Sequence, residues 1–185
     1  MICAILLLAI LTFGHSAIQK HTRRPENVDY LIKRNWKSIV TNDDVILHLG
    51  DVCFGFVDLK DWLGDLPGHK ILVRGNHDAH SVSWYIRNGF EYACDGLVMS
   101  NIWFTHRPSE IVPKEAELGI NVHGHTHNRR PRGWRKYPHC RLFALEYEDF
   151  TPRIISKFLA SIEKEKPFTP QDAALAGDPD REDDR

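Results

Sequence analysis

The sequence lacks an apolar run long enough to cross a bilayer, an excess of either charge, and any pair of closely spaced cysteines. A membrane-spanning helix needs about 20 apolar residues, whereas the longest apolar run here extends only from Ile2 to Leu11. The formal net charge is -1, so the chain as a whole has no attraction for nucleic acid or for an acidic membrane. No C-x-x-C metal spacing occurs among the four cysteines, Cys3, Cys53, Cys94 and Cys140. We expect a cytoplasmic protein with no membrane span and with reduced, mostly buried thiols, a disulfide pair being the alternative.

The apolar run from Ile2 to Leu11 allows two interpretations. A continuous apolar run is typical of a strand buried on both faces by helices, and this is the interpretation we favour. Alternatively, residues 1–17 form a signal peptide, with His15-Ser16-Ala17 as the cleavage region, and the protein is then secreted. No Lys or Arg precedes the run, which argues against a signal peptide.

Composition favours one ordinary globular domain. The 185 residues are 42% hydrophobic and 26% charged, within the range of soluble domains. The C-terminal residues are rich in Asp and Glu and poor in apolar residues to bury. We therefore predict a single domain over residues 1–166 and a disordered acidic tail over residues 167–185.

Hydrophobic periodicity predicts alternating helices and strands. Helices are expected at 25–40, 58–66, 81–88 and 153–165. Strands are expected at 45–49, 70–73, 119–122 and 142–147, with two strand-like runs within 90–105, the second at 101–105.

Four of these predicted strands are each followed by a polar cluster. The clusters are Gly50-Asp51, Gly75-Asn76-His77-Asp78, Thr105-His106 and Gly124-His125-Thr126-His127. Open sheets with helical crossovers bring such strand ends to one edge, where sites form. Carboxylate, amide and imidazole groups together suit manganese, iron or zinc better than calcium. Two such ions clamp a phosphoryl group and activate water, and a separate histidine can protonate the leaving oxygen.

These motifs, in this order, resemble those of the calcineurin-like metallophosphoesterases. The "FGH" at Phe13–His15 and the "LHLGDVCFG" around Asp51 are similar to a small bacterial and phage branch of that superfamily. The resemblance extends from about Phe13 to about Tyr147. It implies an α/β (α+β) fold, a four-layer αββα sandwich of two mixed sheets flanked by helices. It also implies a metal-dependent phosphohydrolase that cleaves a phosphomonoester or phosphodiester through a metal-activated water.

The resemblance assigns a role to each matched residue. Asp51 would bridge two metals, and Asn76, His106 and His125 would complete the second metal's ligands. His127 would bind the first metal. The implied cofactors are one or two divalent ions per chain, of manganese, iron, zinc or nickel.

Four further residues complete this assignment. His77 would be the general acid or would hold the phosphate. Asp78 would either orient His77 or cap the loop. His48 and His123 are expected to be structural.

The chain departs from the superfamily pattern at Ile10 and Thr12, where an Asp and a His would bind the first metal. A divergent start, a one-metal or inactive relative, or a signal peptide would each explain the departure. Because ligand loss lowers metal affinity, we expect weakened phosphohydrolase activity.

The alternative function is a catalytically impaired module that binds metal and phosphate. A basic run from Arg129 to Arg141, interleaved with Trp134 and Tyr137, could follow a nucleotide or a nucleic-acid backbone. We favour a solvated hairpin for this run and a phosphate ester as the substrate.

Overall fold

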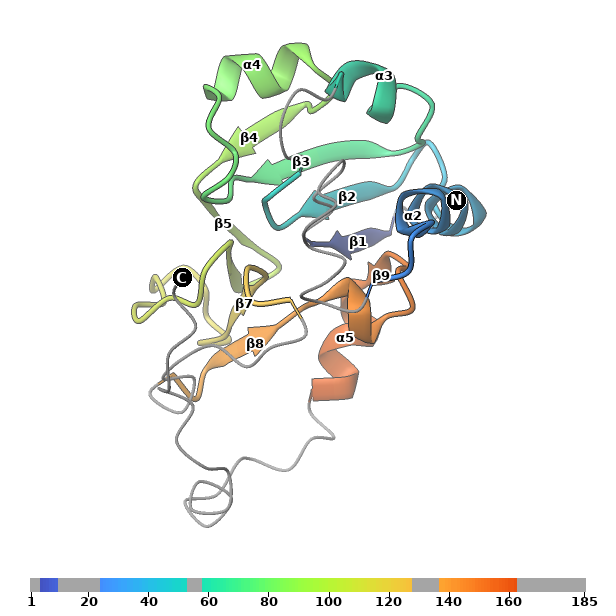
Figure 1. Ribbon diagram of the computed structural model, residues 1–185. Coiled ribbons are helices and arrows are strands. Elements are labelled where there is room, and N and C mark those ends of the chain that lie inside the picture. The colour runs from blue at the N-terminus through green and yellow to red at the C-terminus, as the bar shows by residue number, and fades with distance from the viewer. Residues whose placement is uncertain (1–3, 10–23, 53–57, 128–136, 163–185) are drawn as a thin grey trace, which may run out of the picture.

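The computed structural model describes residues 4–9, 24–52, 58–127 and 137–162 as two β-sheets with accompanying helices (Figure 1). The first sheet has five strands in the order β4-β3-β2-β1-β9, and the second has four in the order β5-β6-β7-β8. Each sheet mixes parallel and antiparallel pairs. The predicted α/β sandwich of two mixed sheets flanked by helices is confirmed.

The first sheet contains the apolar strands of the N-terminal half. Its strands are β1 (Ile5–Leu8), β2 (Val45–His48), β3 (His69–Val73), β4 (Tyr92–Cys94) and β9 (Arg153–Ile154). Strands β1 to β4 pair in parallel, and β9 pairs antiparallel with β1. Leu6, Leu7 and Leu8 are buried, as expected for a strand covered on both faces. Within the described residues, the apolar run therefore forms a central strand; residues 1–3 and 10–17 lie outside them.

The second sheet contains β5 (Gly96–Met99), β6 (Ile102–Thr105), β7 (Asn121–His123) and β8 (Cys140–Leu142). Strand β5 is antiparallel to β6, whereas β6, β7 and β8 are parallel to one another. The parallel pairs within each sheet end at a common edge. In this way β2 and β3, and likewise β6 and β7, place their following loops next to each other (Figure 1).

Within the described parts of the chain, four α-helices join or follow these strands. They are α2 (Val28–Ile39), α3 (Leu59–Leu63), α4 (Val82–Arg87) and α5 (Ile155–Ile162). Helix α2 buries Val28, Ile32 and Trp36, which share one helical face. Ser81 caps α4 by accepting a hydrogen bond from the Trp84 N–H at 3.3 Å. No helix among the described residues has the length and apolarity needed to cross a membrane.

Three predicted elements differ from the structure. The segment 153–165 was expected to be all helix, but Arg153–Ile154 forms β9 before α5 begins. The segment 142–147 contains the end of β8 and then a 3₁₀ helix, η2 (Leu145–Tyr147). The segment 90–105 holds three strands rather than two. In each case a short apolar stretch has no period of its own, so its tertiary neighbours decide its conformation.

The described cysteines are free thiols. Cys94 and Cys140 are half-buried and form no disulfide, and burial raises the pKa of both thiols. Cys3, Cys53 and the predicted acidic tail lie outside the described residues.

Candidate metal centre

The loop after β2 places Asp51 in the interior. Its backbone has positive φ values at Gly50 and Asp51, a conformation that favours glycine. Gly50 has φ +86 and Asp51 has φ 55, in the left-handed region. A Cβ on Gly50 would lie 2.5 Å from His106 Nδ1 and 2.6 Å from the backbone nitrogen of Gly75. The glycine of the "GD" motif is therefore required by close approach of the β3 loop and of His106.

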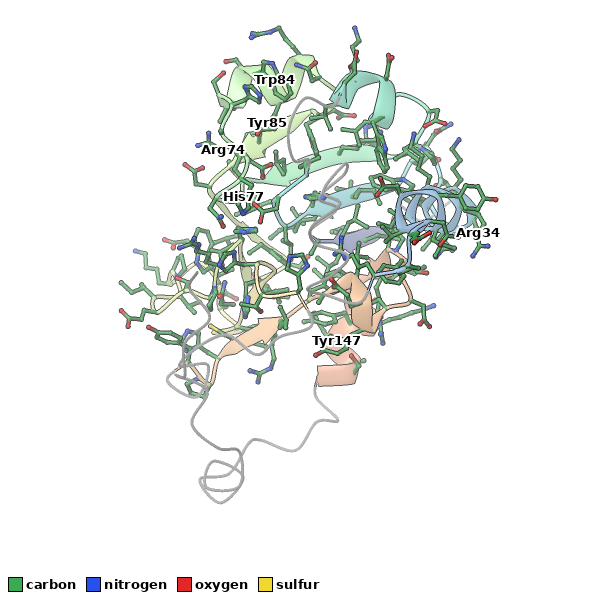
Figure 2. The ribbon with its side chains drawn as sticks, viewed as in Figure 1. Arg34, Arg74, His77, Trp84, Tyr85 and Tyr147 are labelled. Carbon is green, nitrogen blue, oxygen red and sulfur yellow. The ribbon has the colours of Figure 1, made fainter. Side chains whose placement is uncertain are left out.

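The loop after β3 packs directly against Asp51. A Cβ on Gly75 would lie 2.1 Å from Asp51 Oδ1, so this glycine is also required. The backbone N–H of His77 donates to Asp51 Oδ1 at 3.0 Å. Figure 2 shows His77 just beyond the end of β3, and its side chain is exposed.

Asp78 joins the two loops. Its Oδ2 accepts from the backbone N–H groups of Asp51 at 2.8 Å and Gly75 at 2.7 Å, and its Oδ1 accepts from Val52 at 3.0 Å. Burial raises the pKa of Asp78. These bonds give Asp78 the role of loop cap, one of the two that the sequence left open.

His106 follows β6 directly. One of its ring nitrogens faces the Leu49 carbonyl and the other faces Asp51. Its Nδ1 lies 2.7 Å from the Leu49 carbonyl oxygen, which can only accept, so Nδ1 carries the hydrogen. Nε2 then lies 3.2 Å from Asp51 Oδ2 and 3.1 Å from Asn76 Oδ1. Burial raises the pKa of Asp51, but its hydrogen bond with His106 and the charge of His106 outweigh this effect and lower it.

His125 closes the cluster from the loop after β7. Its Nδ1 lies 3.0 Å from His106 Nε2, and its φ is 70. Burial lowers the pKa of His125 to about 4, so at neutral pH its ring is uncharged and keeps a lone pair.

The donor set fits a cation. One ligand atom each from Asp51, His106 and His125 lies within 4.8 Å of the other two, and Asn76 Oδ1 adjoins them. Carboxylate and amide oxygens only accept, and Nε2 of His106 carries at most one hydrogen, whereas Asp51 Oδ2, Asn76 Oδ1 and His125 Nδ1 all lie within 3.2 Å of it. A cation among them resolves this conflict, and mixed oxygen and nitrogen ligands suit a transition metal. Convergence of the four residues is as expected from the sequence; metal binding by them stays a prediction.

His127 has other neighbours. Its Nδ1 lies 3.0 Å from Glu146 Oε1 and 3.4 Å from an amino nitrogen of Arg24. The expected metal role of His127 stays a prediction. Arg24 and Glu146 were not identified from the sequence, because they are 122 positions apart and neither belongs to a strand-end motif.

The remaining histidines of the motifs are buried. His48 Nδ1 accepts from the Gly50 N–H at 3.1 Å, and burial lowers the pKa of His48 to about 3. His123 Nδ1 donates to the Gly124 carbonyl at 2.9 Å, and burial lowers its pKa to about 4. Both bind backbone groups, in agreement with structural roles.

Two features of the sequence cannot be placed. Ile10 and Thr12, where ligands of the first metal are missing, lie outside the described residues. The basic run from Arg129 to Arg141 also lies outside them as far as Lys136. Its last member, Arg141, donates to the carbonyls of Pro138 at 2.6 Å and Cys140 at 2.9 Å.

Sequence comparison finds relatives that match part of this chain. No family model matches the chain. The Gene 66 protein of Mycobacterium phage L5 is 32% identical over 75 residues, 37% of this chain and 36% of that protein. The uncharacterized protein MJ1445 of Methanocaldococcus jannaschii is 27% identical over 124 residues, 62% of this chain and 64% of that protein. The chain thus spans less than two thirds of each of these relatives.

Two solved structures are similar to this chain to different degrees. The protein of unknown function AQ665 from Aquifex aeolicus superimposes with a TM-score of 0.68 at 23% identity, over 87% of this chain and 100% of that one. The Pseudomonas putida nuclease MPE superimposes with a TM-score of 0.47 at 20% identity, over 66% of this chain and 61% of that one. The first likeness supports the two-sheet fold described above.

Proposed function

We propose that this chain is a metal-dependent phosphohydrolase of the calcineurin-like metallophosphoesterase type, acting on a phosphomonoester or phosphodiester. One observation carries the proposal: an acid, an amide and two imidazoles, from four separate strand ends, converge around one ring nitrogen of His106. The order of their motifs in the sequence agrees with that type of enzyme.

The residues at the centre divide into ligands and supports. Asp51, Asn76, His106 and His125 would hold a divalent ion of manganese, iron, zinc or nickel. When bound, such an ion activates water as a nucleophile and neutralises charge on the phosphate. The Leu49 carbonyl fixes the tautomer of His106, as partners of metal-binding histidines commonly do.

His77 is the proposed general acid. Its backbone N–H is bonded to Asp51 while its ring is exposed, so the imidazole can contact a substrate held beside the ligands. The ring would donate its proton to the leaving oxygen as the P–O bond breaks.

An ion at the first-metal position of the superfamily pattern would have fewer ligands. His127 and Asp51 are the proposed ligands for it, and Ile10 and Thr12 offer no carboxylate or imidazole. We therefore propose full affinity for one ion and weak affinity for another, with lowered activity as the consequence.

The test measures metal content and turnover in the same preparations. Elemental analysis after dialysis with manganese should find about one tightly held ion per chain, lost in Asp51→Asn and in His106→Ala. Turnover of bis-p-nitrophenyl phosphate should fall by roughly 10²–10⁴-fold in His77→Ala, the usual contribution of a general acid, with metal content kept. His69→Ala is the matched control, because His69 is an exposed histidine paired with Glu91.

Each outcome separates the candidate functions. Bound metal without turnover in the wild-type chain would favour the metal- and phosphate-binding module over the enzyme. Absence of bound metal would defeat both.

A further inference from the structure

Three charged or polar side chains from distant parts of the chain meet beside the candidate metal centre. Arg24 precedes α2, His127 lies in the loop after β7, and Glu146 lies in η2. Glu146 Oε1 is 2.9 Å from Arg24 Nε, 2.9 Å from an Arg24 amino nitrogen and 3.0 Å from His127 Nδ1. The side chains of Arg24 and Glu146 are 0% and 6% exposed, so this is an interior ion pair.

The two oxygens of the Glu146 carboxylate differ in their hydrogen bonding. Arginine typically grips a carboxylate with two parallel bonds, one to each oxygen. Here the described donors converge on Oε1, and Oε2 is buried without a hydrogen-bond partner among the described residues. Leaving a buried oxygen unpaired destabilises the folded state. The arrangement is therefore not the one that best satisfies an arginine–glutamate pair alone, and it directs Oε1 at His127.

This contact determines which nitrogen of His127 carries hydrogen. Glu146 Oε1 accepts only, and at 3.0 Å it is closer to Nδ1 than the Arg24 amino nitrogen at 3.4 Å. In the neutral form of the ring, Nδ1 is therefore the nitrogen that carries hydrogen, and Arg24 donates to the same carboxylate rather than to the imidazole. The two ring nitrogens lie on opposite sides, so Nε2 keeps the lone pair and points away from Glu146.

The loop that carries His127 needs an external anchor. His125 and His127 have φ values of 70 and 52, in the left-handed region that is unfavourable for residues other than glycine. Such backbone persists when surrounding contacts over-determine it. Glu146 supplies such a contact from η2, 19 positions further along the chain. It belongs to none of the strand-end motifs.

We propose that Glu146, held by Arg24, is a positioning residue for His127: it fixes the Nδ1–H tautomer and presents Nε2 as an electron-pair donor on the side away from η2. The role of that donor in turnover rests on the proposed function. The tautomer itself does not. A carboxylate that orients a histidine in this way is a recurrent support of metal and catalytic sites.

The test is the tautomer of His127, measured by long-range ¹H–¹⁵N NMR of the metal-free full chain at pH 8. The signal is assigned by its loss in His127→Asn. The wild-type chain should show hydrogen on Nδ1. The paired variant Arg24→Met/Glu146→Leu removes both buried charges together and should lose the preference, giving a mixture of tautomers. A wild-type ring with hydrogen on Nε2 would overturn the proposal, as would a paired variant that keeps the Nδ1–H form.

Two further variants keep the test informative. Glu146→Gln retains the shape of the side chain with a weaker acceptor, and should lower the Nδ1–H fraction even if the paired variant fails to fold. Glu148→Gln is the control, because Glu148 lies two positions away and pairs with Arg153. It should leave the His127 signal unchanged.

Turnover gives the second readout. Glu146→Gln should lower kcat by roughly 10–100-fold, the usual effect of losing such a support, whereas Glu148→Gln should not. An absence of turnover in the wild-type chain would defeat the proposed function alone, since the tautomer is measured without substrate or metal.

Discussion

At the scale of single residues, Asp78 holds together the two loops on which the candidate centre depends. Its two oxygens accept three hydrogen bonds from backbone N–H groups of the loop after β2 and the loop after β3. A carboxylate suits this task because it has acceptors only. Asp51 therefore keeps its position through a neighbour that touches no proposed substrate.

Replacing Asp78 by Asn should destabilise the fold and weaken metal binding. The amide keeps one oxygen and turns an NH₂ group toward a backbone donor, so at least one buried N–H loses its acceptor. We expect a loss of about 1–3 kcal/mol in the free energy of unfolding, measured by urea denaturation, with lower metal affinity in calorimetry.

The same substitution at Asp65 is the control. Asp65 is 55% exposed and pairs with Lys33 and Lys37, so Asp65→Asn should change stability by no more than about 0.5 kcal/mol. Equal effects at the two positions would show that Asp78 is not a special cap.

At the scale of elements, β1 is the strand around which the first sheet is assembled. It pairs with β2 on one side and β9 on the other, and its start is tied to the turn before β2 by Asp44, which accepts from the Ala4 N–H at 2.8 Å. Leu7 in its middle is 0% exposed. The strand interpretation of the N-terminal run thus has a direct energetic consequence.

Leu7→Ala should cost about 2–5 kcal/mol of stability, because it removes buried methyl groups and leaves a cavity. Thermal and urea unfolding would measure the loss. Leu118→Ala is the control, since Leu118 is 54% exposed and should change little. Unchanged stability in Leu7→Ala would contradict a packed β1 in the folded protein.

At the scale of the whole molecule, buried neutral histidines make stability depend on pH. His48 is 1% exposed, and burial lowers its pKa to about 3 from the ordinary 6.5. Above pH 6.5 the ring is neutral in both the folded and unfolded states and contributes nothing to the pH dependence. Below pH 6.5 His48 binds a proton in the unfolded chain but not in the folded chain, so the free energy of unfolding decreases as pH falls toward 3.

His48→Gln should remove this part of the acid sensitivity. Each pH unit within the window is worth about 1.4 kcal/mol for one group, so between pH 7 and pH 5 the wild-type chain should lose about 2 kcal/mol more than the variant. Urea denaturation at the two pH values gives the difference. His69→Gln, at a 52% exposed ring, should behave as the wild type, and parallel losses in wild type and His48→Gln would refute the assignment.

Sequence alone determined the apolar strands, the helical face of α2 and the polar motifs at the strand ends. These follow from local rules: periodicity marks the elements, and parallel strands bring their ends to one edge. The approach of Asp51 to Asn76 and of His106 to His125 could be predicted for that reason, whereas the meeting of these two pairs depends on how the two sheets pack.

Tertiary structure decided the two-residue strand β9, the 3₁₀ turn that carries Glu146, and the ion pair through which Arg24 and Glu146 hold His127. It also decided which nitrogen of His106 faces Asp51, since that depends on the carbonyl of Leu49 from another strand. Such features arise from contacts between residues far apart in the chain. The segments involved are too short or too weakly patterned for the local sequence to predict them.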